Sequence, residues 1–289
     1  MPENIPESKG FPNSVYSAEL TPVEFEKLSK FIMTEYGIKM PPEKKIMLQS
    51  RLQKRLKALN MPNFKEYVKY VFSPAGQSQE IIHMMDVVST NKTDFFRESA
   101  HFDFLLSDGL PELLEKGVNN YNIWSAGCSS GEEPYTIAMT MMEFKERHAG
   151  IEFLIKGTDI STNMLQKAVM AIYSEDKVAD IPLTVKKKYF LRSKDREEKK
   201  VRVISELRKR VSFSRLNLLY LPAKAKPEYD IIFCRNVLIY FDRKTQQDIL
   251  SGLCTQLKSG GYLLLGHSES VTGFILPIEG IRPTIFKKI

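Results

Sequence analysis

The sequence predicts an α/β protein in which a small all-α N-terminal domain precedes a doubly wound, Rossmann-like domain with an inserted β-hairpin subdomain. Apolar residues at helical spacing dominate the first third of the chain. After Asn122, short strand-like runs alternate with helix-like segments. Several of these runs are continuously apolar, which is typical of parallel strands covered on both faces. Alternation of this kind favours a doubly wound sheet.

Changes in composition divide the chain. Residues 1–17 are rich in Pro, Ser, Asn and Glu, and we expect them to be mobile. A helical domain is predicted over residues 18–86, a linker over 87–105 and the α/β domain over 106–289. The β insertion of that last domain is expected at about 186–213, where two β-like stretches flank a charged turn.

Four helices are predicted in the N-terminal domain: TPVEFEKLSKFIMTEYG, PPEKKIMLQSRLQKRLKALN, NFKEYVKYVF and SQEIIHMMDVVS. The first begins with Thr-Pro, which suits an N-cap and first turn, and ends at Gly37. One face of the second is apolar and holds Leu48, Leu52, Leu56 and Leu59. Lys44, Arg51 and Arg55 line up beside that face and form a basic stripe.

The composition excludes several classes of protein. The hydrophobic content of 43% supports a folded core. No apolar run reaches the ~20 residues that cross a membrane, and the first residues show no apolar signal segment. Cys128, Cys234 and Cys254 lack metal-ligand or disulfide spacing, so a reducing, cytoplasmic location is expected. The net charge of +7 favours an acidic partner, whether nucleic acid, anionic membrane or protein.

Ligands of open α/β sheets bind outside the carboxyl ends of the strands. The predicted strands are NIWSAG, EFLIKGTD, RVSFSRLN, YDIIFCRN and GYLLLGHSE. The first ends in a turn at Gly127, which Glu132 and Glu133 follow. This turn has no lysine and no Gly-Lys-Ser/Thr ending of an ATP-binding loop, and its carboxylates would repel phosphate. It suits a ligand without phosphate that carries positive charge.

The next strand ends complete the outline of a nucleoside site. Asp159 could accept hydrogen bonds from ribose hydroxyls, and Asn217 could bond a base edge while Leu218 packs on its face. Arg235 and Asn236 end the fourth strand. S-adenosylmethionine fits this pattern, whereas NAD would need a fuller Gly-x-Gly-x-x-Gly turn. Taken singly, each feature also has a plainer interpretation as a connecting turn, a helix cap or a polar loop.

Five longer motifs resemble the CheR family of chemotaxis receptor methyltransferases: TNKTDFFRE, WSAGCSSGEEPYTIAM, GTDIS, FCRNVLIYFD and LKSGGYLLLGHSES. The resemblance covers nearly the whole chain from about residue 18. It implies S-adenosylmethionine-dependent methylation of glutamate side chains on the cytoplasmic helices of a chemoreceptor. The products would be glutamyl γ-methyl esters and S-adenosylhomocysteine, and the process would be chemotaxis adaptation or related signalling.

The resemblance also implies which residues form the site, with the linker closing over the cofactor. Implied cofactor-binding residues are Asn91, Thr93, Arg97, Gly127, Glu133, Asp159, Asn217, Leu218, Arg235, Asn236 and Val237. Arg97, Arg235 and Tyr240 are implied at the reacting centre. The motif carries both Glu132 and Glu133, so the choice between them stays open. No metal is expected, because His83, His101 and His148 show no ligand spacing.

The chemistry agrees with these roles. Glutamate, with a reference pKa of about 4.3, is already ionised near pH 7, so methyl transfer requires no general base. Arg97 and Arg235 could hold the second carboxylate oxygen, although a surface ion pair of Arg97 with Glu98 or Asp94 is the alternative. We interpret His267 as a hydrogen-bonded residue at a strand end.

Two surfaces are candidates for receptor contacts. The basic stripe Lys44, Arg51 and Arg55 could dock on a glutamate-rich helix, or it could be a solvated face. The inserted hairpin is where some family members hold a receptor's C-terminal pentapeptide by strand addition. Those members tend to carry glycines in the hairpin loop, whereas residues 193–200 here contain none. Peptide tethering therefore stays open.

Two rival functions are less compatible with the sequence. A base-directed nucleic-acid methyltransferase usually has an Asp/Asn-Pro-Pro-Tyr/Phe motif after the fourth strand, and this chain has no proline there. A non-catalytic cofactor sensor would not require Arg97, Arg235 and Tyr240 together. We therefore expect a chemoreceptor partner, no nucleic acid and no insertion into a membrane.

Overall fold

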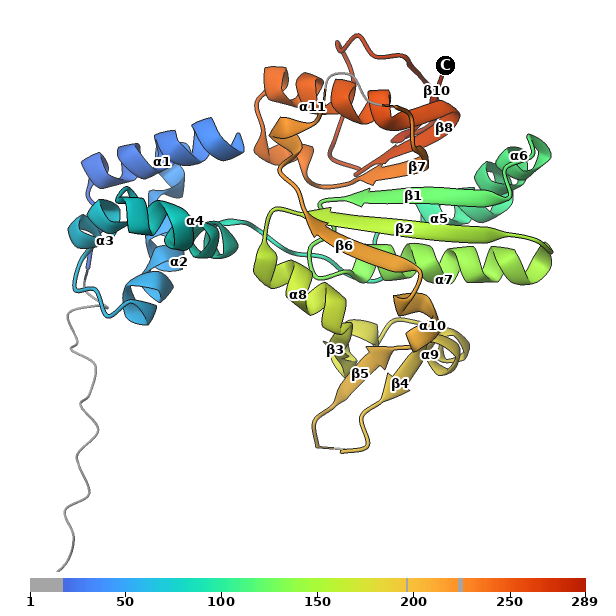
Figure 1. Cartoon of the computed structure of the whole chain (residues 1–289), viewed down its shortest axis with the longest axis horizontal. Helices are drawn as coiled ribbons and strands as arrows, with labels where there is room; N and C mark the ends of the chain where they lie inside the picture. The colour runs from blue at the N-terminus through green and yellow to red at the C-terminus, as the bar shows by residue number, and fades with distance from the viewer. Residues whose placement is uncertain (1–17, 196, 223–225) are drawn as a thin grey trace, which may run out of the picture. The chain divides into compact units, whose positions relative to one another are not determined.

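The computed structural model describes residues 18–195, 197–222 and 226–289 (Figure 1). Residues 1–17, for which mobility was predicted, lie outside the described residues. The chain divides into two compact units, Met1–Thr90 and Asn91–Ile289. The predicted linker 87–105 falls partly in each unit, because its first residues complete a helix of the helical unit and its last residues begin a helix of the α/β unit.

The helical unit contains the four predicted helices, together with a short 3-10 helix. Its elements are α1 Pro22–Tyr36, η2 Pro42–Lys44, α2 Lys45–Ala58, α3 Phe64–Val71 and α4 Pro74–Val88. Thr21 caps α1 in a capping box with Glu24, and Gly37 ends it in the left-handed conformation with φ 68°. Leu48, Leu52 and Leu56 are buried as their spacing predicts, whereas Leu59 is half-buried because α2 ends at Ala58.

The α/β unit is built on a seven-stranded sheet within the described residues, with the order β6-β2-β1-β7-β8-β10-β9. Its strands are β1 Asn120–Ala126, β2 Glu152–Asp159, β6 Val211–Arg215, β7 Tyr229–Cys234, β8 Leu257–Leu265, β9 Ile278–Arg282 and β10 Ile285–Lys288. The five predicted strands pair in parallel. The antiparallel strands β9 and β10, which were not predicted, extend the sheet beyond β8.

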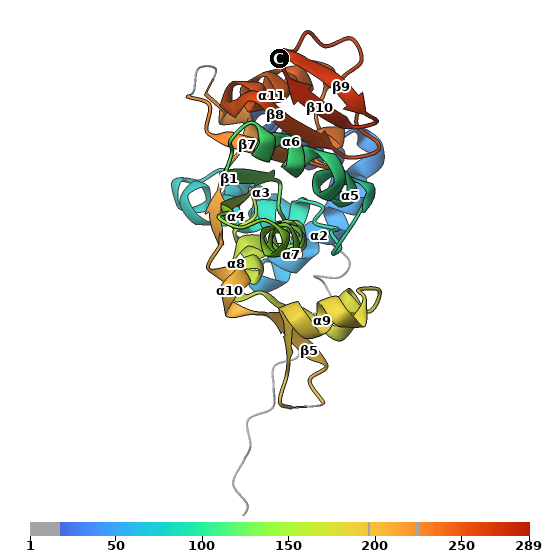
Figure 2. The same cartoon turned by 90° about the vertical axis from the view of Figure 1, so that its right-hand side faces the viewer.

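Helices cover the sheet on both sides, as Figures 1 and 2 show for α7 along β2 and α11 beside β8. The helices are α5 Ala100–Phe104, the π-helical turn η3 Leu105–Gly109, α6 Leu110–Glu115, α7 Glu132–Arg147, α8 Thr162–Met170, η5 Leu218–Tyr220, η6 Leu238–Tyr240 and α11 Arg243–Gln256. No helix in the described ranges is long and apolar enough to cross a membrane.

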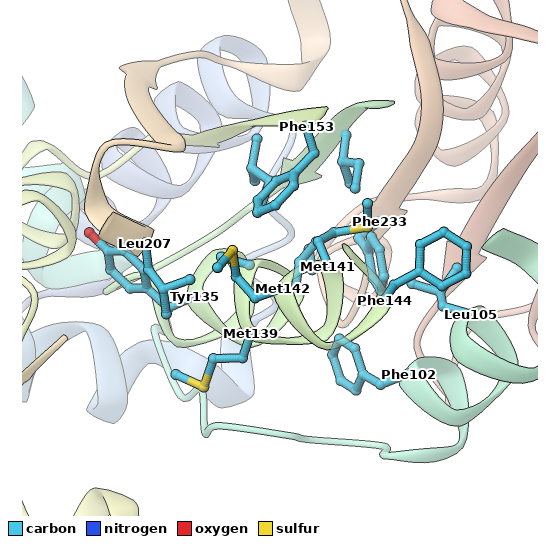
Figure 3. Close-up of a cluster of buried hydrophobic side chains, with 14 of the residues drawn as sticks. Phe102, Leu105, Tyr135, Met139, Met141, Met142, Phe144, Phe153, Leu207 and Phe233 are labelled. Atoms are coloured by element: carbon cyan, nitrogen blue, oxygen red, sulfur yellow. The ribbon is translucent and has the colours of Figure 1, made fainter. Parts of the chain in front are cut away.

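The core forms because strand residues alternate between two buried layers. Ile123 and Phe233 belong to the apolar cluster on the α7 side, while their neighbours Trp124 and Ile232 are equally buried on the opposite face. Figure 3 shows side chains of α7, including Met142 and Phe144, beside Phe102 and Phe233. The cysteines Cys128, Cys234 and Cys254 are all buried and unpaired.

The insertion is a three-stranded antiparallel sheet with the order β3-β5-β4, set apart from the main sheet in Figure 1. Its elements are β3 Ile172–Ser174, η4 Glu175–Val178, α9 Leu183–Tyr189, β4 Phe190–Arg192, β5 Lys200–Val203 and α10 Ser205–Arg208. The predicted hairpin corresponds to β4 and β5. The insertion begins earlier than residue 186, because the short strand β3 pairs with β5, and Phe213 lies in β6 of the main sheet.

Candidate active site

The turn after β1 brings the backbone close to the end of β7. Gly127 has φ 84°, a conformation that L side chains rarely adopt. A Cβ atom at this position would lie 2.3 Å from Cγ2 of Val237. The N–H groups of Gly127 and Cys128 both donate to the carbonyl of Thr158, at 2.7 and 2.9 Å. A glycine is therefore required here for both conformation and space.

Asp159, at the end of β2, is buried and supports the glycine turn directly. Its Oδ2 accepts a hydrogen bond from the N–H of Ser129 at 2.8 Å, and its Oδ1 accepts one from the N–H of Ser161 at 2.9 Å. The carboxylate thus links the turn after β1 to the start of α8.

The segment 91–98 lies over the glycine turn and the start of α7. Ser129 Oγ donates to the carbonyl of Asn91 at 3.0 Å. Lys177, from the insertion, donates to the carbonyl of Thr93 at 2.7 Å and pairs with Asp94 at 2.8 Å. Hydrogen bonds therefore hold this segment from both the turn and the insertion.

Two phenylalanines fasten this segment to the α/β unit. The ring of Phe95 packs edge-on against Tyr173 and Phe190 of the insertion, with centroids 4.9 and 5.3 Å away. The N–H of Phe96 donates to Thr136 Oγ1 of α7 at 3.1 Å. Arg97 follows, and its Nη1 donates to the carbonyl of Lys92 at 3.1 Å.

Arg97 and Arg235 have different environments. The side chain of Arg97 is 37% exposed, and its Nε lies 4.0 Å from Glu98 Oε1, a loose form of the surface ion pair considered from the sequence. The side chain of Arg235 is only 2% exposed, and its guanidinium sits between two carboxylates. Nη2 lies 3.2 Å from Glu98 Oε2, and Nη1 lies 3.4 Å from Glu133 Oε2.

The two adjacent glutamates of the turn face different groups. Glu133 accepts a hydrogen bond from Ser125 Oγ at 2.7 Å and pairs with Arg235, so it belongs to the strand ends. Glu132 accepts a hydrogen bond from Ser130 Oγ at 2.7 Å and lies 4.0 Å from Lys177 of the insertion. Burial raises the pKa of both carboxyl groups, and the nearby cations oppose that shift.

Glu98, which sequence reasoning did not assign to the site, contacts several polar groups. Its Oε1 accepts a hydrogen bond from Asn236 Nδ2 at 3.3 Å. His101 Nδ1 and His267 Nε2 lie 3.8 and 3.9 Å from its Oε2. Burial alone would raise the pKa of Glu98, but the Arg235 guanidinium and the hydrogen bonds hold it below its usual value.

The expectation that His101 belongs to no ligand-like group was wrong. The donor atoms of Glu98, His101 and His267 lie within 4.8 Å of one another. His101 is 1% exposed, and its Nε2 lies 2.9 Å from Thr284 Oγ1, while its Nδ1 has no hydrogen-bond partner among the described residues. The Arg235 guanidinium beside Glu98 opposes a cation at this point, because like charges repel strongly where water is excluded.

Glu269 is a second residue that sequence reasoning missed. Its carboxylate is buried and accepts hydrogen bonds from the N–H groups of Asn236, Val237, Leu238 and Gly266, at 2.6–2.9 Å. These bonds fix the turn after β7, where Asn236 adopts φ 59°. The available signal was a glutamate that closely follows the apolar strand β8.

The remaining predicted residues lie at the same edge or in the helical unit. Asn217 caps η5, where its Oδ1 accepts a hydrogen bond from the N–H of Leu219 at 3.1 Å, and Leu218 is buried. Tyr240 ends η6 and is half-buried. The structure therefore brings the glycine turn, Asp159, the segment 91–98 and the β7 turn together within the α/β unit.

The three residues of the basic stripe all make hydrogen bonds to other residues of the helical unit. Arg55 Nε and Nη2 donate to the two oxygens of Glu80, at 2.8 and 2.7 Å, and Tyr67 donates to the same carboxylate at 2.9 Å. Arg51 donates to the carbonyl of Val88 and to Thr90 Oγ1. Lys44 Nζ donates to the carbonyl of Lys39 at 3.2 Å.

Comparison with known proteins gives consistent matches over both units. A model described as the SAM binding domain of CheR methyltransferase matches residues 91–278, and one described as the CheR all-alpha domain matches residues 23–89. The chemotaxis protein methyltransferase of Borreliella burgdorferi is 42% identical over 275 residues, which cover 93% of this chain and 95% of that protein. That of Escherichia coli K12 is 36% identical over 253 residues, covering 87% and 85%.

Proposed function

Because the chain belongs to the CheR methyltransferase family, we propose that it methylates glutamate side chains of chemoreceptor helices. The coarser statement, a chemotaxis methyltransferase with a SAM-binding domain, follows from the family itself. The finer proposal names the methyl donor S-adenosylmethionine, the acceptor carboxylate and the products, glutamyl γ-methyl esters and S-adenosylhomocysteine. The proposed enzyme is a protein-glutamate O-methyltransferase.

The donor set at the strand ends fits this cofactor. Asp159 and Glu133 supply negative charge, and the turn from Gly127 to Gly131 contains no lysine, so the site suits a positively charged ligand without phosphate. When bound, the cofactor supplies a methyl group that its sulfonium activates. Residues proposed to hold it are Asn91, Thr93, Arg97, Gly127, Glu133, Asp159, Asn217, Leu218, Arg235, Asn236 and Val237.

The single observation that supports the mechanism best is the contrast between the two arginines. Arg235 is buried and already flanked by Glu98 and Glu133, whereas the side chain of Arg97 is 37% exposed. Arg97 is therefore the better candidate to grip an incoming carboxylate in a bidentate fork. Arg235 would instead hold the carboxylates of Glu98 and Glu133 in place beside Arg97. We propose that Tyr240 lines the methyl path or orients the substrate.

The chain's residues need only position the reactants. A glutamate near pH 7 is already a carboxylate, so no side chain must remove a proton. The nucleophilic oxygen must come within about 3–3.5 Å of the methyl carbon and in line with it. A grip that is too strong would also reduce nucleophilicity, because the carboxylate loses charge in the transition state. Orientation, rather than tight ground-state binding, is therefore the proposed task of Arg97.

A methyl-transfer assay with two acceptors tests the proposed function. The full chain receives radiolabelled S-adenosylmethionine and either a chemoreceptor cytoplasmic fragment or RNA. We expect base-labile label on the receptor fragment, since glutamyl esters hydrolyse in base, and none on RNA. Base-stable label on RNA would support the nucleic-acid alternative. Cofactor binding in calorimetry without label on either acceptor would support a non-catalytic sensor.

We still propose that the helical unit docks on the receptor, but fewer of its basic side chains are available for that contact. The pairing of Arg55 with Glu80 and the hydrogen bonds of Arg51 give both arginines structural roles. Lys44, which is half-buried, makes a hydrogen bond to a carbonyl but no ion pair in the described part of the chain. Long-range attraction by this basic stripe would raise the association rate and fall with salt.

A further inference from the structure

We propose that Glu98 is a positioning residue, which sets the geometry of Arg97 and Arg235 together. This inference rests on the proposed function, because it concerns the same site. The side chain of Glu98 is 10% exposed and lies beside the guanidinium of Arg235, with Oε2 at 3.2 Å from Nη2 and 3.4 Å from Nε. Its other oxygen holds the amide of Asn236. One carboxylate therefore joins the segment 91–98 to the end of β7.

The backbone around Arg97 shows why such an anchor is required. Phe96 and Glu98 have φ 53° and 54°, so two non-glycine residues in the left-handed region bracket Arg97. A left-handed conformation is unfavourable for a residue with a side chain and persists only where surrounding contacts impose it. The bond from Phe96 to Thr136 and the contacts of the Glu98 carboxylate are those that impose it here.

Glu98 also couples the two arginines to each other. Nη2 of Arg235 donates to the main-chain carbonyl of Arg97 and lies beside Glu98 Oε2. A shift of the Glu98 carboxylate would therefore move the buried guanidinium and the main chain of Arg97 together. Because a bidentate grip depends on orientation, an error of about 1 Å in Arg97 can lower the rate by about 10²-fold.

The charge balance explains why the anchor must be ionised. Glu98 and Glu133 flank the buried Arg235. Neutralising Glu98 would leave the guanidinium with Glu133 as its one remaining ion-pair partner among the described residues. Hydrogen bonds to a charged partner are worth more than those between neutral groups, so Gln at position 98 would hold Arg235 less firmly. The exposed His267 and buried His101 beside Glu98 would then face a neutral amide.

The test compares Glu98→Gln and Glu98→Asp with Glu112→Gln, a control that alters a carboxylate paired with Lys116 and Lys287 in the α/β unit. For Glu98→Gln we expect kcat to fall 10- to 100-fold, while the Kd of S-adenosylhomocysteine rises by a clearly smaller factor, because Asp159 and the glycine turn still hold the cofactor. Glu98→Asp keeps the charge and should recover at least part of the loss. Glu112→Gln should keep a kcat within twofold of the natural chain.

An NMR readout separates failure of this inference from failure of the proposed function. The Nε–H signal of Arg235, assigned by its loss in Arg235→Lys, should exchange at least tenfold faster with solvent in Glu98→Gln than in the natural chain. This holds whether or not the receptor fragment is methylated. Unchanged exchange, or a kcat within twofold of the natural value, would overturn the role of Glu98. A loss of kcat equalled by a loss of cofactor affinity would do the same.

Discussion

Arg97 and Arg235 are two residues of one type whose environments in the proposed site differ. The exposure of Arg97 leaves its guanidinium able to meet a substrate, while Arg235 is committed to two buried carboxylates. A partly exposed guanidinium can turn toward a carboxylate and form a planar, two-point contact, which an ammonium cannot reproduce. The difference between the two arginines follows from burial and neighbours, and not from residue type.

The first prediction concerns Arg97→Lys, which keeps the charge and removes the fork. We expect kcat for methyl transfer to fall ten- to a thousandfold, or about 1.4–4 kcal/mol of barrier, with cofactor affinity altered less than fivefold. Arg192→Lys, at a 72% exposed ion pair of the insertion, is the matched control. A near-normal kcat, or a defect confined to cofactor binding, would instead make Arg97 a lid on the cofactor and leave Arg235 as the substrate clamp.

The second prediction concerns His101 and pH. Burial, and then the Arg235 charge, lower the pKa of His101 to about 4 from an ordinary 6.5. Between these values the unfolded chain binds a proton that the folded chain does not, so stability rises with pH across this window. Lowering the pH from 6.5 to 4 should cost about 3 kcal/mol through this group.

Urea unfolding at pH 4 to 7 measures this effect. His101→Gln should show a smaller loss of unfolding free energy over the window than the natural chain. If His101→Gln and the natural chain respond equally to pH, His101 does not titrate as stated.

At the scale of elements, the glycine turn and the β7 turn support each other. Asp159 and Glu269 each satisfy backbone N–H groups of a turn, and the two turns meet where Gly127 approaches Val237. Carboxylates that accept several backbone bonds hold loops rigidly, because a buried N–H group without a partner is costly. The shape of the proposed site therefore depends on the backbone of these two turns, which Asp159 and Glu269 hold in place through hydrogen bonds.

The third prediction is for Gly127→Ala. Two effects add at this position, the left-handed φ of 84° and the 2.3 Å approach to the stiff Val237 side chain. Gly117→Ala is a matched control, since its φ is 85° and nothing lies within 4 Å of an added Cβ. The left-handed conformation alone costs roughly 1–2 kcal/mol. We expect Gly127→Ala to be less stable than Gly117→Ala in urea unfolding and to bind S-adenosylhomocysteine at least tenfold more weakly. Equal stability and equal cofactor affinity of the two variants would mean that the Val237 side chain moves aside at no cost.

At the scale of the whole molecule, each unit has its own core and its own buried ionic network. In the helical unit, Glu80 is 1% exposed and receives Arg55 and Tyr67. In the α/β unit, Arg235 with Glu98 and Glu133 plays the corresponding part. These networks contain at least as many carboxylates as guanidinium groups, so the chain's net charge of +7 comes from residues outside them.

The fourth prediction distinguishes a structural from a docking role for Arg55. Arg55→Ala would leave the Glu80 carboxylate buried without its cation, and breaking a buried pair in this way costs about 3–5 kcal/mol. Urea unfolding of the full chain should show that loss, while Lys54→Ala on the exposed side of α2 should change little. A higher KM for the receptor fragment with unchanged stability would contradict the assignment and restore Arg55 to docking.

The sequence by itself determined the four helices of the helical unit, the five parallel strands and the edge of the sheet where the proposed site lies. Helix caps, apolar periodicity and continuous apolar strands are local signals, which explains why α1 with its Gly37 end and the parallel strands were predicted correctly. The residues after strands β1, β2 and β7 do meet, because the carboxyl ends of parallel strands share one edge. The strands β9 and β10 escaped notice because both are short and mix apolar residues with Glu, Arg and Lys, which leaves no continuous apolar run.

Only the tertiary structure decided how the charged residues pair. Arg55 and Glu80 are 25 residues apart, and Arg235 and Glu98 are 137 apart, so no spacing rule relates them. The same applies to Glu132 and Glu133, which are adjacent in the chain yet face Lys177 and Arg235 respectively. A charged side chain can be buried only where its partner is also placed, and that placement depends on the whole fold. This is why the sequence indicated the candidate residues of the site, whereas only the structure showed which charged side chains pair with one another.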